Sequence, residues 1–511
     1  MSADYDLVIL GGTLEGRFAA SLAAGYGARV ALIEPPGIFA QRQQVRYLLK
    51  GLQQLARGKE AQAVSTWFSR SASPFDFIRS DIDSLDWQAL VEWSAIATET
   101  QLLPLSSEVL NSRGVDFIWA TPEFLSRHAS PRRLQVVADR RSLSTRAVLA
   151  AFGTVPRSNP ASDPNAETGA RAASPINKPL ITGVESLLQS ESLPKEISIL
   201  GDSFIAVDWA EALSAMGTSV TLVADRFLRD EDSDVRAVVR SQLLTAGIKI
   251  ISSQHRETQY NREPHKEEQH LSPTIALPIA LQLGRHKPAL TLPDFVYQPN
   301  SGYQGIDAHI QERPYLLSNS RLQTAHPRIF ACGSLLRRRV FPESVAQHEA
   351  QVAVRNALFF PTQRTNYNTV VQAYARFAKV GRTPKFSKEG RAPISRGYRE
   401  FSASLPNSVD LSYEIPKPSY CKIICRNNRV QSIQLLGTDA ESTITALAPM
   451  VSRSLTEFLS AAERVTGPTV VENLSDLVKQ AVMGEVCDRW QPTHWRRDWA
   501  ENWFNWRRSR R

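Results

Sequence analysis

A glycine-rich turn between two strand-like segments constrains the fold of this chain more than any other feature. Residues 5–10 read as an apolar strand, the following helix is rich in alanine, and a second apolar run, residues 30–33, ends at Glu34. The turn contains Gly11, Gly12, Thr13 and Gly16. This order of strand, turn, helix, strand and acid is typical of a dinucleotide-binding βαβ unit. It predicts an α/β fold with a nucleotide site at the edge of a parallel sheet.

The residue types in this motif have physical reasons. Gly11 allows the tight turn, and Gly16 allows the helix and the strand to pack closely. The N-terminus of the helix offers N–H donors and a positive dipole end to a pyrophosphate. Glu34 lies where an acid accepts hydrogen bonds from a ribose 2′-hydroxyl. We therefore predict that these residues bind a nucleotide.

Two residues depart from the usual motif. Thr13 replaces the glycine that lets the backbone approach a phosphate, although its hydroxyl could donate a hydrogen bond to one. Glu15 would repel a pyrophosphate unless its carboxylate points to solvent. The alternative interpretation is an ordinary glycine-rich turn that binds no ligand.

A second βαβ pattern follows at residues 196–223. Its turn contains Gly201, Ser203 and Ala206. Alanine is tolerated at the third position, which needs only close packing, whereas Ser203 narrows the groove for a pyrophosphate. The strand ends near Asp225 and Arg226, an acid and a base, so the pattern does not separate NAD from NADP.

Composition bounds the class of protein. A chain of 511 residues with 42% hydrophobic and 22% charged residues predicts several globular domains. No apolar run is long enough to span a membrane, the N-terminus has no signal-peptide pattern, and four cysteines suit a reducing compartment. We therefore predict a cytoplasmic protein. The net charge of +9 permits an acidic partner, but no motif predicts nucleic-acid binding, and no histidine or cysteine pattern predicts a metal site.

These motifs, taken in order over roughly residues 4–480, resemble the pyridine nucleotide-disulfide oxidoreductases. Gly11–Gly16 and Glu34 resemble that family's FAD motif, and 201–208 resembles its NAD(P) motif. The stretch 151–154, which contains Gly153, is similar to a family strand that passes near FAD. The stretch 329–334, with Gly333 and Ser334, is similar to one that touches the ribityl chain. Ser334 replaces an aspartate of the family pattern, and so loses charge assistance in that contact.

The resemblance implies two Rossmann-like FAD- and NAD(P)-binding domains with a C-terminal α+β dimerisation domain. We predict the following boundaries: 1–156 with 291–362 for FAD binding, 179–290 for NAD(P) binding, 363–487 for dimerisation, and 488–511 for a basic tail. The resemblance also implies FAD as cofactor, NAD(P)H as a second one, and a homodimer.

The departures from the family bear on the reaction. The family's disulfide reductases carry a C-x4-C pair shortly after the position of Glu34, but here no cysteine precedes Cys332. Their C-terminal base is a histidine, and the matching stretch 471–476 has none. Thiol–disulfide exchange needs an attacking and a resolving thiol. Cys421 and Cys425 lie on one face of a predicted strand, where we interpret them as a buried pair.

We therefore predict a flavin-dependent NAD(P)H oxidoreductase without disulfide chemistry. Its electron acceptor is an unidentified small molecule, and no side chain is predicted as a catalytic acid or base. The alternative is a non-catalytic family member that keeps the fold as a scaffold.

The C-terminal tail is a separate feature. Trp495, Trp499, Trp503 and Trp506 share one face of a predicted helix over 490–511, among several arginines. The stripe is compatible with three roles: packing on the body of the protein, lying on a membrane surface, or docking on a protein partner.

Overall fold

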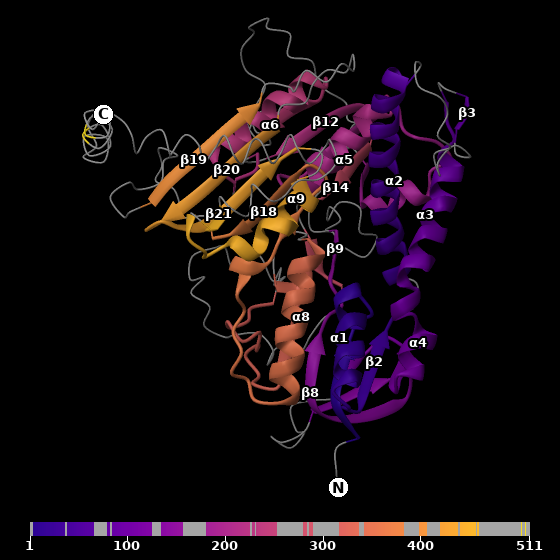
Figure 1. Ribbon diagram of the computed structural model, residues 1–511. Coiled ribbons are helices and arrows are strands. Elements are labelled where there is room, and N and C mark those ends of the chain that lie inside the picture. The colour runs from indigo at the N-terminus through magenta and orange to yellow at the C-terminus, as the bar shows by residue number, and fades with distance from the viewer. Residues whose placement is uncertain are drawn as a thin grey trace, which may run out of the picture. The chain divides into compact units, whose positions relative to one another are not determined.

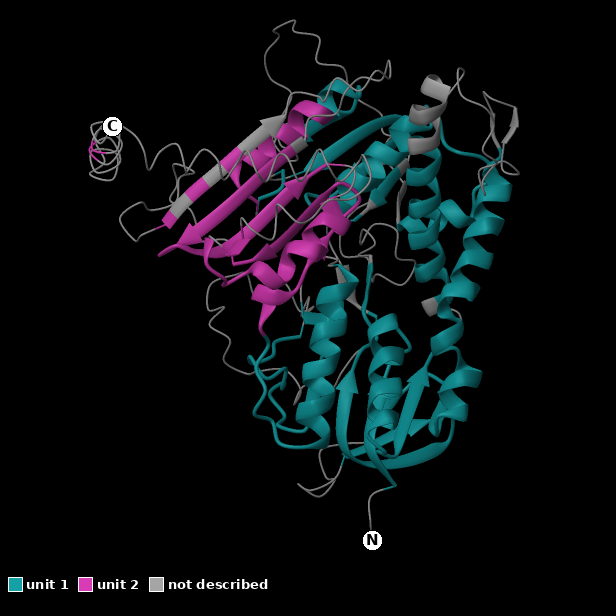
Figure 2. Cartoon of the chain, in the orientation of Figure 1, with its two compact units in different colours: residues 1–229, 243–365 teal, residues 230–242, 366–511 magenta. Residues whose placement is uncertain are grey.

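The computed structural model describes eighteen stretches of the chain. They are 4–35, 38–65, 79–81, 84–124, 134–156, 180–224, 227–229, 231–252, 279–283, 286–289, 316–336, 342–382, 398–405, 419–437, 440–455, 457–458, 502 and 506. The chain divides into two compact units (Figure 2). The first unit is Met1–Arg229 with Leu243–Thr365, and the second unit is Asp230–Gln242 with Asn366–Arg511. The finer boundaries that the sequence suggests stay a prediction.

The first unit contains a seven-stranded sheet in the order β5-β2-β1-β8-β7-β6, with β16 beside β8. Its strands are β1 (Tyr5–Leu10), β2 (Val30–Glu34), β5 (Val115–Trp119), β6 (Glu123–Phe124), β7 (Leu134–Ala138), β8 (Arg141–Ala150) and β16 (Ile329–Ala331). β1 pairs in parallel with β2 and β8, and β16 pairs in parallel with β8. The carboxyl ends of β1, β8 and β16 therefore meet at one edge of the sheet.

Both faces of this sheet are buried. In β1, Leu7 and Ile9 belong to one core cluster, and Val8 and Leu10 belong to the cluster on the opposite face. Helices α1 (Leu14–Gly25) and α8 (Glu343–Leu358) contribute alanine and valine side chains to the first of these clusters and lie side by side (Figure 1). A continuous apolar strand is typical of a parallel sheet that is covered on both faces.

The remaining elements of the first unit's N-terminal part are mostly helical. They are α2 (Ile38–Ser65), α3 (Trp87–Leu102), the 3₁₀ helix η2 (Leu103–Leu105), α4 (Ser107–Ser112), and the short strands β3 (Arg79–Asp81) and β4 (Ser84–Leu85). Asp86 caps α3, because its carboxylate accepts a hydrogen bond from the backbone N–H of Ala89. Ser106 caps α4 in the same way through the N–H of Val109.

A second sheet of the first unit is parallel throughout, in the order β10-β14-β11-β12-β13. Its strands are β10 (Leu180–Thr182), β11 (Glu196–Leu200), β12 (Ser219–Ala224), β13 (Lys249–Ser252) and β14 (Ile279–Gln282). Helix α5 (Phe204–Ala215) connects β11 to β12, as the second motif predicts. η4 (Val184–Gln189) and η6 (Gly333–Leu336) are 3₁₀ turns, and β9 (Thr154–Pro156) pairs with β15 (His286–Pro288). Helix α6 (Ser233–Thr245) follows β12 in the chain, and most of it belongs to the second unit.

The second unit is built on an antiparallel sheet in the order β17-β18-β21-β20-β19. Its elements are β17 (Gln372–Ala373), β18 (Phe377–Gly381), β19 (Tyr398–Leu405), β20 (Ser419–Arg426), β21 (Arg429–Leu436), α9 (Ala440–Leu447), and the 3₁₀ turns η7 (Tyr367–Thr369) and η9 (Ala448–Met450). Cys421 and Cys425 are buried within its apolar core, as predicted. The predicted fold class, parallel Rossmann-like sheets followed by a C-terminal α+β domain, is confirmed.

Candidate functional site

The turn between β1 and α1 can be made only by glycine at its first position. Gly11 has φ +101°, and a Cβ atom built on it would lie 2.2 Å from the backbone Cα of Phe152. The turn therefore passes against the end of β8 with no room for a side chain. A tight, close-packed turn of this kind is what a dinucleotide motif requires at this glycine.

Thr13 uses its hydroxyl within the protein. Its Oγ1 donates a hydrogen bond to the carbonyl oxygen of Ala151 (2.5 Å) and accepts one from the backbone N–H of Gly16 (3.3 Å). The residue therefore acts as the N-cap of α1. The sequence allows Thr13 to donate a hydrogen bond to a phosphate. Its hydroxyl has a single proton, so that bond would replace the one to the carbonyl oxygen of Ala151.

Glu34 is at the predicted position, at the carboxyl end of β2, but it is already paired. Its Oε2 lies 2.9 Å from Nη2 of Arg17 and 3.2 Å from Nε, and both residues are less than 10% exposed. Burial raises the pKa of Glu34 to about 7, although the adjacent guanidinium acts in the opposite direction. Sequence reasoning missed Arg17, whose signal was a basic residue directly after Gly16 in an alanine-rich helix.

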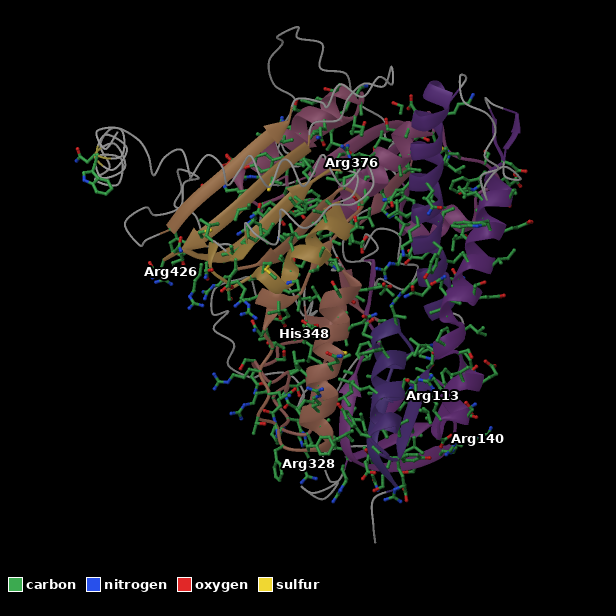
Figure 3. The ribbon with its side chains drawn as sticks, in the orientation of Figure 1. Arg113, Arg140, Arg328, His348, Arg376 and Arg426 are labelled. Atoms are coloured by element: carbon green, nitrogen blue, oxygen red, sulfur yellow. The ribbon has the colours of Figure 1, made fainter. Side chains whose placement is uncertain are left out.

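Glu15, whose carboxylate the sequence allows to point to solvent, lies instead against Gly333. A Cβ atom built on Gly333 would lie 2.2 Å from Oε1 of Glu15, so the carboxylate lies against the backbone of Gly333. Oε2 of Glu349, on α8, accepts the N–H of Gly333 at 2.8 Å. Burial raises the pKa of Glu15, and the carboxylate of Glu349 adds to that effect. His348, labelled on α8 in Figure 3, directly precedes Glu349.

Arg42 of α2 lies beside Gly153, at the end of β8. Gly153 has φ +67°, and a Cβ built there would be 2.9 Å from Nη1 of Arg42 and 3.4 Å from both Oγ of Ser334 and Cγ2 of Thr13. Nη1 donates to the carbonyl oxygen of Phe152 (3.3 Å). Nη2 is buried and has no hydrogen-bond partner among the described residues. An unsatisfied guanidinium donor in this position suits an anionic or oxygen-rich ligand.

The buried cysteine next to this site is not set up as a nucleophile. Cys332 lies directly before Gly333 and is fully buried. Burial raises the pKa of its thiol well above the usual value, and the carboxylates of Glu15 and Glu349 act in the same direction. A thiol that stays protonated is a poor nucleophile. Packing is therefore the simplest role for Cys332.

The second predicted nucleotide turn lies between β11 and α5. The backbone N–H of Gly201 donates to the carbonyl oxygen of Val223 (3.0 Å), and Ala206 is fully buried, as close packing requires. Ser203 is at the N-cap position of α5, but its side chain makes no cap hydrogen bond there. Asp225 and Arg226 lie outside the described residues, so the preference between NAD and NADP stays open.

The backbone of the first unit fits a dinucleotide such as FAD. Gly11, Gly153 and Gly333 all have positive φ, and they follow the neighbouring parallel strands β1, β8 and β16. In open parallel sheets, ligands bind outside the carboxyl ends of the strands. The unsatisfied Nη2 of Arg42 lies at this edge. The predicted contact between Glu34 and a ribose requires an exchange of partners, because the carboxylate of Glu34 is already paired with Arg17.

Within the described residues, the His, Cys, Asp and Glu side chains form no group that could hold a metal ion. None of the described helices combines the length and apolar character needed to cross a membrane.

Comparison with known proteins places the chain among relatives of one kind. The family model described as pyridine nucleotide-disulphide oxidoreductase matches residues 5–357. Dihydrolipoyl dehydrogenase from Acholeplasma laidlawii is 25% identical over 378 residues, which are 72% of this chain and all of that protein. Glutathione reductase from Burkholderia cepacia is 23% identical over 505 residues, 93% of this chain and 98% of the relative.

Solved structures share the fold over nearly the whole chain. LpdA from Mycobacterium tuberculosis is 18% identical, with a TM-score of 0.65, and the match covers 93% of this chain and 99% of LpdA. The flavoprotein disulfide reductase RclA from Escherichia coli is 19% identical, with a TM-score of 0.59 and the same coverage. At these identities the likeness establishes the fold. The family model matches more than half of the length of this chain, and the chain therefore belongs to the pyridine nucleotide-disulphide oxidoreductase family.

Proposed function

We propose that this protein is an FAD-dependent oxidoreductase that takes a hydride from NAD(P)H and reduces a small-molecule acceptor without disulfide chemistry. One observation carries the proposal: three positive-φ glycines, Gly11, Gly153 and Gly333, meet at one sheet edge beside the N-terminus of α1. Members of the matching family are FAD-dependent and use NAD(P)H. FAD, when bound, would supply the redox chemistry.

The residues of this chain would hold and orient the cofactors. Gly11, Gly12, Thr13 and Gly16 would surround the pyrophosphate at the N-terminus of α1, and Glu34 would accept hydrogen bonds from the ribose. Gly153, Gly333 and Ser334 would border the ribityl chain, and Arg42 would direct its unsatisfied Nη2 to an oxygen of the cofactor. Gly201, Ser203 and Ala206 would bind NAD(P)H.

The cysteines support a reaction other than disulfide reduction. Helix α2, which follows Glu34, contains no cysteine, and Arg42 and Arg46 lie on it instead. The three cysteines in the described part of the chain are buried and belong to no disulfide. Burial raises the thiol pKa of Cys332 and Cys421, which makes the thiolate scarce at neutral pH. The stretch 471–476, matched to the family's histidine motif, lies outside the described residues.

The second candidate function is a non-catalytic scaffold, and two specific contacts favour it. Arg17 pairs with Glu34, and the carboxylate of Glu15 lies at the N-terminus of α1, where a pyrophosphate would bind. A protein that does not bind FAD needs neither a free carboxylate at Glu34 nor an uncharged N-terminus of α1. In either case we propose a cytoplasmic homodimer, with the tail 490–511 as a surface for a membrane or a protein partner. Of that tail only residues 502 and 506 are described, and both are helical and exposed.

Anaerobic reduction tests the leading proposal. The FAD-loaded protein is mixed with NADH or NADPH, and the absorbance of oxidised flavin is followed. We expect bleaching by at least one of the two, and recovery of the absorbance on adding oxygen or a quinone. Lipoamide, oxidised glutathione and mercuric ion should give no turnover, because the dithiol that those reactions need is missing. Flavin that stays oxidised would favour the scaffold, and lipoamide turnover that depends on a cysteine would contradict the non-disulfide reaction.

A further inference from the structure

The guanidinium of Arg17 is held firmly next to the nucleotide turn. Its Nε donates to the carbonyl oxygen of Gly12 (3.2 Å), its Nη1 donates to the carbonyl oxygen of Leu105 (2.9 Å), and its Nη2 pairs with Glu34 (2.9 Å). The guanidinium also lies over the ring of Phe117, 5.1 Å from its centroid. Every nitrogen of Arg17 thus has a partner, and the side chain is only 8% exposed. A cation held by this many contacts is a fixed part of the turn.

The backbone of the motif is adapted to this pair. A Cβ atom built on Gly12 would lie 1.4 Å from Oε2 of Glu34, so the carboxylate rests directly on the Cα of Gly12. Any larger residue at position 12 would push Glu34 away from Arg17. Gly12 and Arg17 therefore work together to turn Glu34 toward the interior, where it is 3% exposed.

We propose that Arg17 is a gate on the dinucleotide site: it competes with the ribose hydroxyls of the ligand for the carboxylate of Glu34. The inference rests on the proposed function, because it assumes that the site binds FAD. In the ligand-free protein Glu34 is satisfied by Arg17. Binding requires the carboxylate to exchange a charge-assisted pair for hydrogen bonds with neutral hydroxyls. The exchange takes from the buried guanidinium of Arg17 its carboxylate partner, which makes the exchange unfavourable.

The gate makes the affinity of the site depend on a residue that need not touch the ligand. Replacing Arg17 by an apolar side chain of similar length leaves Glu34 buried and without its partner, so ribose hydroxyls then satisfy an otherwise unpaired group. We expect Arg17→Met to bind FAD and ADP at least tenfold more tightly than the natural protein. Arg17→Lys keeps the charge but loses the two-pronged guanidinium contact. Its affinity for FAD and ADP should lie between those of the natural protein and Arg17→Met.

The experiment measures binding rather than turnover. FAD is titrated into apoprotein by fluorescence, and ADP and its 2′,3′-dideoxy analogue are titrated by calorimetry, for the natural protein, Arg17→Met and Arg17→Lys. Arg113→Met is the matched control, because Arg113 is an exposed arginine of the same unit that contacts Ser21 and lies outside the site. Thermal melting checks that each variant is folded. Should Arg17→Met fail to fold, Arg17→Lys and the dideoxy analogue still test the gate.

The outcomes separate the gate from the function. A gain of tenfold or more in Arg17→Met, absent in Arg113→Met and lost with the dideoxy analogue, supports competition for Glu34. Tight FAD binding by the natural protein with no gain in either Arg17 variant overturns the gate and leaves the proposed function standing. A gain that is equal for ADP and its dideoxy analogue also overturns it, because hydroxyls would then be irrelevant. Absence of FAD and ADP binding in every variant overturns the proposed function together with the gate.

Discussion

Gly11→Ala is expected to destabilise the first unit strongly. The new Cβ would meet the backbone Cα of Phe152 at 2.2 Å and its backbone N at 2.5 Å, so relief requires the turn and the end of β8 to separate. The residue would also have to keep φ +101°, which a side chain disfavours. We expect a loss of unfolding free energy of about 4 kcal/mol or more, because overpacking and backbone strain act together at this position. Denaturant unfolding and FAD titration measure the two consequences.

Gly27→Ala separates strain from collision. Gly27 follows α1, has φ +78°, and a Cβ built on it meets nothing within 4 Å. Gly27→Ala should therefore lower the unfolding free energy only by the backbone strain, about 1–2 kcal/mol, and leave FAD affinity unchanged. Equal losses of stability in the two variants would show that the contact with Phe152 does not fix the turn.

Lys422→Ala is expected to have a comparably large effect in the second unit. Nζ of Lys422, on β20, lies 3.2 Å from Asp232, 3.2 Å from Asp234 and 3.4 Å from Glu400, and the side chain is 1% exposed. Burial lowers the pKa of Lys422, but the carboxylates outweigh it and leave the pKa above its ordinary value. Removing the ammonium leaves the buried carboxylate of Asp232 without its cation, which costs about 3–5 kcal/mol. Urea unfolding of the variant gives the value.

Lys379→Ala is the control in the same unit. Lys379 pairs with Glu231 at 2.6 Å, and both side chains keep some contact with solvent. Its loss should cost less than the loss of Lys422, since solvent can reach both partners of this pair. An equally small loss of unfolding free energy in both lysine variants would show that Lys422 does not stabilise the three carboxylates.

Backbone architecture was predictable because its causes are local. The glycine spacing of 11–16, the alanine-rich helix and the apolar strands predict β1, α1 and β2, and the second motif predicts β11, α5 and β12 in the same way. The length of β8 depends on pairing with other strands. It runs unbroken over Arg141–Ala150 because its first half pairs with β7 and its second half pairs with β1 and β16.

Side-chain pairing at the site was not predictable, because it depends on contacts between distant segments. The place of Glu34 after the second strand predicts that it faces a ligand. Only the packed turn reveals that Arg17 reaches the carboxylate of Glu34 and that Gly12 leaves room for this carboxylate. The inward turn of Glu15 depends on Gly333, which is far away in the chain. Lys422 and its carboxylates come from three separate segments, and no local pattern joins them.

The flavin content of the purified protein tests the central claim most directly. The full chain is purified without added cofactor, its visible spectrum is recorded, and it is then saturated with FAD, desalted and measured again against protein concentration. The account predicts about one FAD per chain after saturation, with a flavin spectrum that differs from free FAD, and a lower content before saturation because Arg17 competes for Glu34. A folded protein that returns from desalting colourless, in both the natural form and the Arg17→Met variant, would contradict it.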